Sequence, residues 1–287
     1  MISLLLSILA STLIFLIFKL FYRFKVNTLQ AIVFNYITAC FCGVIVSESQ
    51  LDFQEIVHSE WFFGALSLGL LFISIFNVMA ITSQRNGLSV ASVATKMSVI
   101  IPVVFGIYMY QESAGFQKIF GIFLALFAVY FVSIKKEAKF HFKNNLLLPS
   151  ILFLGSGIID TSIKYIETTY IKDGGIPIFS ATIFFFAACI GIVILIYRMI
   201  KKEFKFNPQS ILGGLVLGVV NYASIYYLLK ALNHDTLESS NIFTINNVAI
   251  VMFTSLIGLL LFKEKLSLKN WIGVGLAIIS ILLVTLA

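Results

Sequence analysis

The sequence is poor in the residues from which disulfide frameworks and metal centres are built. It contains three cysteines and three histidines in 287 residues. The cysteines, Cys40, Cys42 and Cys189, all lie within apolar runs, and no two histidines stand at ligand spacing. Cys40 and Cys42 are two positions apart, which on a helix points them to different faces. The composition therefore indicates neither a disulfide framework nor a metal enzyme, and no cofactor is expected.

Charge is equally scarce. Only 11% of the residues are charged, 60% are hydrophobic, and the mean hydropathy is +1.02, far outside the range of a soluble domain. No connection between apolar runs is long enough to hold a soluble domain, and no GxxxxGK[ST] phosphate-binding loop is present. The net charge of +7 comes from basic residues in short loops, so it reports membrane orientation and not a nucleic-acid partner. The expected partners are the lipid bilayer and a small-molecule substrate, with a homodimer left open.

Long apolar runs are what the sequence has in place of charge. About 20 apolar residues cross a bilayer, and ten such runs occur, at 2–20, 30–46, 61–83, 89–110, 116–134, 146–166, 177–197, 210–232, 239–262 and 269–287. The first run has its basic residues after it and none before it, so we interpret it as a retained helix and not as a signal peptide. The fold class expected is an all-α integral membrane protein with ten transmembrane helices.

The loop charges predict the orientation. Most lysines and arginines fall in the odd-numbered connections, and four of them lie in the segment 135–145. The second connection is acidic, with Glu48, Asp52, Glu55 and Glu60. Odd-numbered loops are therefore expected in the cytoplasm and both termini outside it, in a plasma (inner) membrane.

The two halves of the sequence resemble each other. A shift of 152 residues superposes four residue pairs without a gap, and a shift of 149 superposes GALSLG at 64–69 on GGLVLG at 213–218. The four pairs are Gly106 and Gly258, Glu112 and Glu264, Gly121 and Gly273, and Ala125 and Ala277. Thr254 stands opposite Pro102 under the same shift. We expect one repeat at 1–134, a basic cytoplasmic linker at 135–145 and a second repeat at 146–287. Five spans is an odd number, so the second repeat would insert inverted, with the substrate near the midplane.

YQESAGFQKIFGIFLALFAVYFVS and FKEKLSLKNWIGVGLAIISILLV close the two halves. Both resemble the closing pattern of the EamA-like repeat in the drug/metabolite transporter superfamily: an apolar helix, a glutamate at a tight turn, a short polar link and a final glycine-containing helix. The resemblance implies ten helices, two inverted five-helix repeats, a central cavity, and export or import of small metabolites such as amino acids.

Lys96 is the main candidate for a functional residue because it lies inside the fourth apolar run. A lysine in hydrocarbon costs at least a few kcal/mol unless it snorkels, finds a partner or faces water. Lys96 is about 10 Å from the cytoplasmic end, so snorkelling is one explanation. The other is that Lys96 binds an anionic group of the substrate, because Ser92, Thr95 and Ser98 make this half of the helix polar. Its repeat partner is Val248, so the charge exists in one half only.

Other polar residues inside the runs are secondary candidates. Asp160 and Lys164 share a helix face, and they form either a neutral ion pair or, if Asp160 faces a cavity, a proton-coupling site. Asn221, Tyr222 and Asn247 are substrate-binding candidates near mid-membrane, where a hydrogen bond to a neighbouring helix is the alternative role. Asn35 and Asn77 are kept in reserve.

The remaining signals have structural explanations. Glycines such as Gly64, Gly218 and Gly258 let helix backbones approach closely. Pro102 lacks a backbone donor and is expected to kink its helix just beyond Lys96. Glu112 and Glu264 are expected to cap helices or pair loops at their turns.

The sequence therefore favours a secondary transporter, not an enzyme, for a small anionic or zwitterionic metabolite such as an amino acid. A lipid-carrier flippase, or a membrane-embedded protein acting on a lipid phosphate, is the alternative. In that case Lys96 would bind the phosphate. No nucleophile, acid/base or metal constellation supports enzymatic chemistry.

Overall fold

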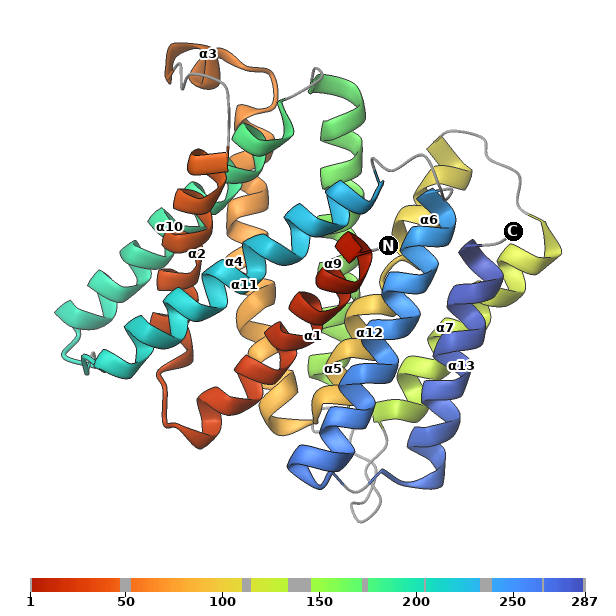
Figure 1. The fold of residues 1–287 in the computed structure, drawn as a ribbon. Helices are drawn as coiled ribbons and strands as arrows, with labels where there is room; N and C mark the ends of the chain where they lie inside the picture. Colours follow the sequence, from red (N-terminus) through yellow and green to blue (C-terminus); the bar gives the residue numbers. More distant parts are fainter. Residues whose placement is uncertain are drawn as a thin grey trace. The chain divides into compact units, whose positions relative to one another are not determined.

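The computed structural model describes residues 2–46, 53–109, 115–133, 146–171, 175–203, 205–232, 239–264 and 266–285. This part of the chain is helical and contains no strand (Figure 1). The helices are α1 (Ile2–Arg23), α2 (Thr28–Val46), α3 (Phe53–His58), α4 (Phe62–Arg85), α5 (Leu88–Met97), α6 (Ile100–Met109), α7 (Phe116–Ser133), α9 (Leu147–Tyr170), α10 (Ile176–Ile200), α11 (Pro208–Leu232), α12 (Ser239–Phe262) and α13 (Leu268–Thr285). The predicted linker 135–145 and Glu112 lie outside the described residues.

The predicted all-helical class is confirmed, and each predicted apolar run falls on a helix or a helix pair. Seven stretches of the described chain are long and apolar enough to cross a membrane. They are Ile2–Arg23, Thr28–Val46, Phe62–Arg85, Leu88–Gly106, Pro177–Ile200, Pro208–Leu228 and Ile245–Phe262. Ile119–Val132, Leu147–Ile163 and Leu268–Leu283 are shorter apolar helical stretches on the remaining runs. The short helix α3 was not expected from the sequence.

The fourth run is not the single helix expected over 89–110, because it is interrupted at Ser98 and Val99 between α5 and α6. Pro102 has no N–H to donate to the carbonyl of Ser98 four residues earlier. That carbonyl instead accepts from the N–H of Ile101 at 2.9 Å, three residues on. The interruption lies just beyond Lys96, where the sequence predicted a kink. Helix α12, which the 152-residue shift aligns with this run, carries Thr254 at the position of Pro102 and is continuous.

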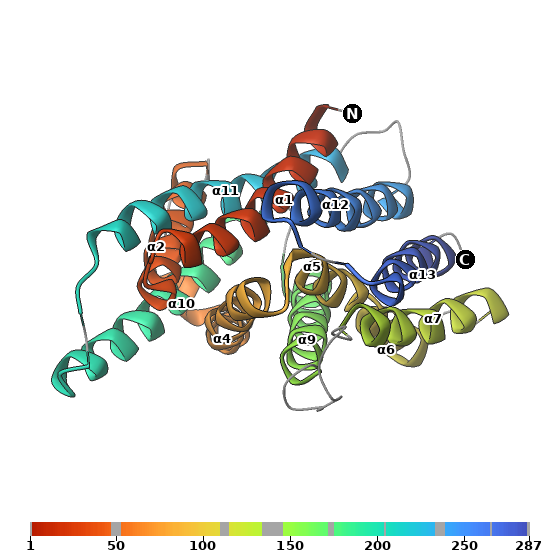
Figure 2. The same cartoon turned by 90° about the horizontal axis from the view of Figure 1, so that it is seen from below.

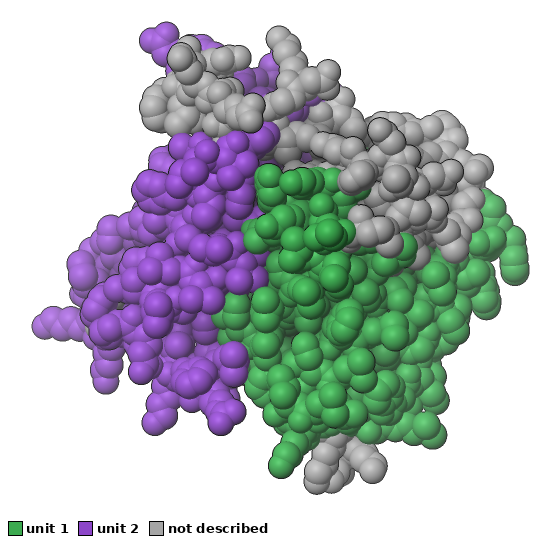
Figure 3. Space-filling view, viewed as in Figure 1, with its two compact units in different colours: residues 1–19, 78–158, 223–287 green, residues 20–77, 159–222 purple. Residues whose placement is uncertain are grey.

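The helices form two compact units, and each unit takes segments from both halves of the chain (Figure 3). Unit 1 comprises residues 1–19, 78–158 and 223–287, and unit 2 comprises residues 20–77 and 159–222. Helices α1, α4, α9 and α11 each contribute residues to both units.

In unit 1, α13 packs along α7, as Figures 1 and 2 both show. The contact is close because small residues, among them Ala125, Ala128 and Ala277, line it and are fully buried. A Cβ atom at Gly273 would lie 2.6 Å from the backbone nitrogen of Val132. Ser280 near the end of α13 donates to the carbonyl of Gly121 near the start of α7 at 2.7 Å. The two helices therefore run antiparallel.

Helix α12 packs against α5 in the same unit. The hydroxyls of Thr254 and Ser92 are hydrogen-bonded at 2.7 Å. One end of the pair is fixed by Gly258, whose added Cβ would lie 3.7 Å from the Cβ of Leu88. Since the residue numbers rise in opposite directions, α5 and α12 are also antiparallel.

Unit 2 is built around α2 and α10. Gly43 approaches Ala181, and Gly191 approaches Val33, so this pair is antiparallel as well. Tyr36 on α2 is fully buried, and its ring stacks on that of Phe184 on α10. Its hydroxyl donates to the carbonyl of Phe72 at 2.9 Å, which satisfies the one polar group of this side chain.

Candidate functional site

Lys96 lies in the last turn of α5, with a half-buried side chain. The interruption at Ser98 gives α5 a C-terminus inside the apolar run. The last carbonyls of a helix carry a partial negative charge, which stabilises a nearby cation by up to about 2 kcal/mol in partly buried geometry. The broken helix thus supplies a local electrostatic reason for a lysine at this depth. Sequence reasoning missed this reason because it assumed one continuous helix.

Asn247 on α12 lies level with this break. Extending the antiparallel register from the Leu88–Gly258 and Ser92–Thr254 contacts places Asn247 opposite Ser98 and Val99. Asn247 is 8% exposed. Unit 1 therefore brings Lys96 and Asn247 to within about one helical turn of the same depth, next to the interrupted backbone.

Two further polar side chains, those of Ser7 and of Asn246, the chain neighbour of Asn247, are buried in unit 1. The hydroxyl of Ser7 on α1 donates to the carbonyl of Ser224 at 3.0 Å and contacts Oδ1 of Asn246 at 3.3 Å. Ser7 was not identified from the sequence. Its contacts lie 217 and 239 residues away along the chain, so no local pattern reveals them.

Asn221 belongs to unit 2, where its amide donates to Oδ1 of Asn35 at 3.3 Å. Asn221 is 4% exposed and Asn35 is fully buried. Gly218 on the same helix would place a Cβ 2.7 Å from the carbonyl oxygen of Asn35, so α11 and α2 are in close contact here. This geometry matches the helix-packing role that the sequence left open beside substrate binding. The side-chain amide nitrogen of Asn35 is buried without a hydrogen-bond partner in the described structure.

The other candidates lie in unit 2. Tyr222 is half-buried, and its ring lies 3.5 Å from the position of a Cβ at Gly43. Asp160 lies on α9 with an exposed side chain. The side chain of Lys164, its predicted partner, is outside the described part of the structure.

A polar cluster that the sequence analysis identified only in part surrounds Glu264, at the turn between α12 and α13. The carboxylate accepts from the N–H of Leu88 at 3.1 and 3.2 Å and lies 3.0 Å from Nζ of Lys19. The expectation that Glu264 caps a helix is therefore confirmed, because Leu88 is the first residue of α5. Lys19 is 245 residues away from Glu264 along the chain, so no local pattern pairs the two residues.

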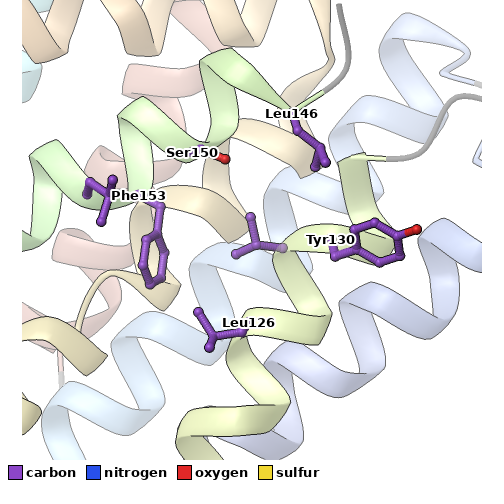
Figure 4. Close-up of a pocket in the computed structure, with 7 residues that line it drawn as sticks. Leu126, Tyr130, Leu146, Ser150 and Phe153 are labelled. Atoms are coloured by element: carbon purple, nitrogen blue, oxygen red, sulfur yellow. The ribbon is translucent and has the colours of Figure 1, made fainter. Parts of the chain in front are cut away.

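A cavity of about 310 Å³ opens between α7 and the start of α9 in unit 1 (Figure 4). Its lining is apolar apart from Ser150 and the hydroxyl of Tyr130. Several lining side chains, Leu126 and Leu154 among them, are about half exposed. The cavity contains none of the candidate residues and has the character of a groove facing lipid, not of a polar substrate site.

The fold and these residues define a polytopic helical membrane protein with polar groups beside a broken helix. Residues 150–286 match the EamA-like transporter family, which is part of the drug/metabolite transporter superfamily. The resemblance found in the sequence is thereby confirmed for the second half of the chain. The match points to a membrane transporter rather than an enzyme.

Two other similarities span nearly the whole chain. An uncharacterised protein of Haemophilus influenzae is 29% identical over 279 residues, covering 95% of this chain and 93% of its own. A solved crystal structure has a TM-score of 0.55 at 13% identity and covers 98% of this chain and 97% of that chain. At that identity the second similarity shows the fold alone.

Proposed function

We propose that this protein is a secondary transporter that moves a small anionic or zwitterionic metabolite, such as an amino acid, by alternating access. The observation that carries the proposal is Lys96 at the end of an interrupted membrane helix. In transporters with broken helices, half-helix N-termini point at anionic groups of the substrate, and α6 begins at Ile100, just beyond Lys96. Lys96 supplies the positive charge for a carboxylate, and Asn247 supplies an amide at similar depth.

Asn221, Tyr222 and Asp160 complete the proposed set of functional residues. Asn221 and Tyr222 contribute to substrate binding from α11, and Asp160 on α9 couples transport to protons. The protein acts in the plasma membrane, with odd-numbered loops in the cytoplasm and both termini outside. These assignments rest on residue type, position along the helices and loop charge.

The proposed architecture is ten spans in two inverted repeats, 1–134 and 146–287, joined by the linker 135–145. Three helix pairs support it. Helices α2 and α10, α5 and α12, and α7 and α13 occupy corresponding positions in the two halves, and each pair packs together. All three pairs run antiparallel, as expected of helices related by inversion.

The test is solute flux into proteoliposomes that contain the purified protein. A thermal-shift screen against amino acids, organic acids and sugar phosphates selects the solutes, because a ligand of the native state raises its apparent stability. Counterflow of a labelled solute identifies a carrier. Lys96→Gln is expected to reduce flux about 10- to 150-fold, since a lost charged hydrogen bond is worth about 1.5–3 kcal/mol. Lys96→Arg is the matched control, because it retains the charge.

Unchanged flux in Lys96→Gln would contradict the proposed role of this residue. A long-chain lipid phosphate that co-purifies and stabilises the protein, with no small solute carried, would favour the flippase instead. The same lysine could bind that phosphate, so the identity of the cargo decides between the two functions.

A further inference from the structure

Three segments that are distant in sequence meet at the carboxylate of Glu264 in unit 1. Lys19 near the end of α1 contacts Oε1 at 3.0 Å and also donates to the carbonyl of Ser83 at 3.1 Å. The N–H of Leu88 donates to both carboxylate oxygens. One carboxylate therefore joins the end of α1, the start of α5 and the turn after α12.

Two glycines make room for this carboxylate. A Cβ at Gly87 would lie 2.9 Å from Oε2, and a Cβ at Gly258 would lie 2.7 Å from the same atom. Gly87 also has φ of 110°, a conformation that favours glycine. The side chains of Lys19 and Glu264 are only 18% and 12% exposed. The two glycines and the low exposure of both side chains distinguish this ion pair from a chance contact on the surface.

The location of the pair makes it reversible. Each partner lies at a helix end beside polar turns, where water can replace the contact when the segments separate. Because the two side chains are only 18% and 12% exposed, separating them leaves poorly solvated charges unless water reaches them, so the pair biases the balance between a closed and a hydrated conformation. The α7–α13 contact in the same unit differs, because it buries small apolar residues against backbone and offers water little to replace.

We infer that the Lys19–Glu264 pair is a latch that holds this end of unit 1 closed and releases during transport. The inference rests on the proposed alternating access. The carboxylate alone caps α5, and Lys19 neutralises its charge, as a carboxylate that is 12% exposed requires. The lysine adds α1 to the contact and thereby links the first helix to α5, the helix that carries Lys96. When the latch opens, the first turn of α5 loses its cap and water enters between α1, α5 and α12.

The test measures water access and needs no substrate. Cys40, Cys42 and Cys189 are replaced by alanine, and one new cysteine is introduced as a probe in reconstituted protein. Ser89→Cys probes the first turn of α5 beside the latch, where Ser89 is fully buried. Ser255→Cys probes α12 three residues before Gly258, about 4.5 Å deeper than the carboxylate, where Ser255 is 1% exposed. The rate of reaction with a membrane-impermeant maleimide is then compared among latch variants.

Lys19→Gln is expected to raise the labelling rate of both probes at least about fivefold, because the closed state loses roughly 1 kcal/mol. Lys19→Arg retains the charge and should stay close to the unmodified latch. Lys263→Gln removes an exposed lysine next to Glu264 and should change the rates by less than about twofold. An increase at Ser89→Cys alone would show a static helix cap and overturn the latch, as would no increase at either probe.

Hydrogen–deuterium exchange provides a measurement without cysteine replacement. Peptides covering 247–258 should exchange at least about fivefold faster in Lys19→Gln, while peptides of α7 and α13 stay unchanged. Equal exchange in 247–258 would overturn the latch even if solutes are transported. Faster exchange and labelling in a protein that carries no solute would instead overturn the proposed function and leave the opening of this end established.

Discussion

At the scale of single residues, a polar group inside the membrane needs a hydrogen-bonding or charged partner. Buried Asn221 has Asn35, buried Asn246 has Ser7, and Glu264 has Lys19 and the N–H of Leu88. Lys96 lies at the C-terminal end of a helix. A lysine in the last turn of α5 is stabilised by the helix dipole.

Asp160 provides a residue-scale prediction for coupling. If its carboxylate carries the coupling proton, Asp160→Asn removes the only titrating state at that position, and transport that varies with pH in the unmodified protein becomes independent of pH. The measurement is initial flux in proteoliposomes between pH 5 and 8. Asp160→Glu is the control, because it keeps a titrating group and should keep the dependence. A pH profile that persists in Asp160→Asn would assign the coupling to another group.

Gly273 provides a prediction for packing. Gly273→Val should lower the free energy of unfolding by about 1–3 kcal/mol, since its Cβ would lie 2.6 Å from the backbone of α7 and the two helices would have to separate. Thermal unfolding of the purified protein in detergent measures the change. Gly275→Ala is the matched control two residues away, where an added Cβ meets nothing within 4 Å. It should be neutral or stabilising by about 0.5–1 kcal/mol.

At the scale of elements, the interrupted pair α5 and α6 differs from the continuous helix α12. The two stretches occupy equivalent places in the two halves, yet one breaks at Ser98 and the other runs unbroken from Ser239 to Phe262. Pro102 opposite Thr254 accounts for the difference. A hydroxyl in the helix interior can bond back to its own helix, as Thr254 does to the carbonyl of Ile250 at 2.7 Å, whereas proline removes a bond.

Pro102→Ala tests the origin of the break. Alanine restores the N–H that can donate to the carbonyl of Ser98, so the apparent stability should rise by about 1 kcal/mol. Flux should fall severalfold, because Lys96 would lose its position at a helix end. Thermal unfolding and flux are measured on the same preparation. Pro177→Ala is the control, since that proline lies in the first turn of α10, where no intrahelical donor is lost. Unchanged flux in Pro102→Ala would separate the break from the transport mechanism.

At the scale of the whole molecule, both compact units draw on both halves of the chain. Neither half therefore forms one of the compact units alone. The glycines predicted to let helices approach do so at Gly69, Gly214 and Gly218. Gly258 has a different role, because the space it leaves is filled by the carboxylate of Glu264.

The predicted orientation can be tested on the full chain. A C-terminal alkaline phosphatase, which is active only outside the cytoplasm, should be active, and a C-terminal reporter that works only in the cytoplasm should be inactive. The reversed fusion result would invert the proposed topology. It would also move the Lys19–Glu264 end of unit 1 from the cytoplasmic side to the other side.

The sequence by itself determined where the helices are. In hydrocarbon, backbone N–H and C=O groups have no partner except each other. An apolar run of about 20 residues therefore forms a helix. The interruption near Pro102 was also predictable, because it follows from the chemistry of a single residue and its chain neighbours.

Only the tertiary structure decided which polar residues serve each other. Lys19 and Glu264, Ser7 and Asn246, and Asn35 and Asn221 are each more than 180 residues apart. Hydropathy and spacing report how a residue relates to its own helix, and they contain no information about which helix lies beside it. For this reason the sequence could name Lys96 as exceptional and predict a kink beside it, but it could not give Glu264 its partners.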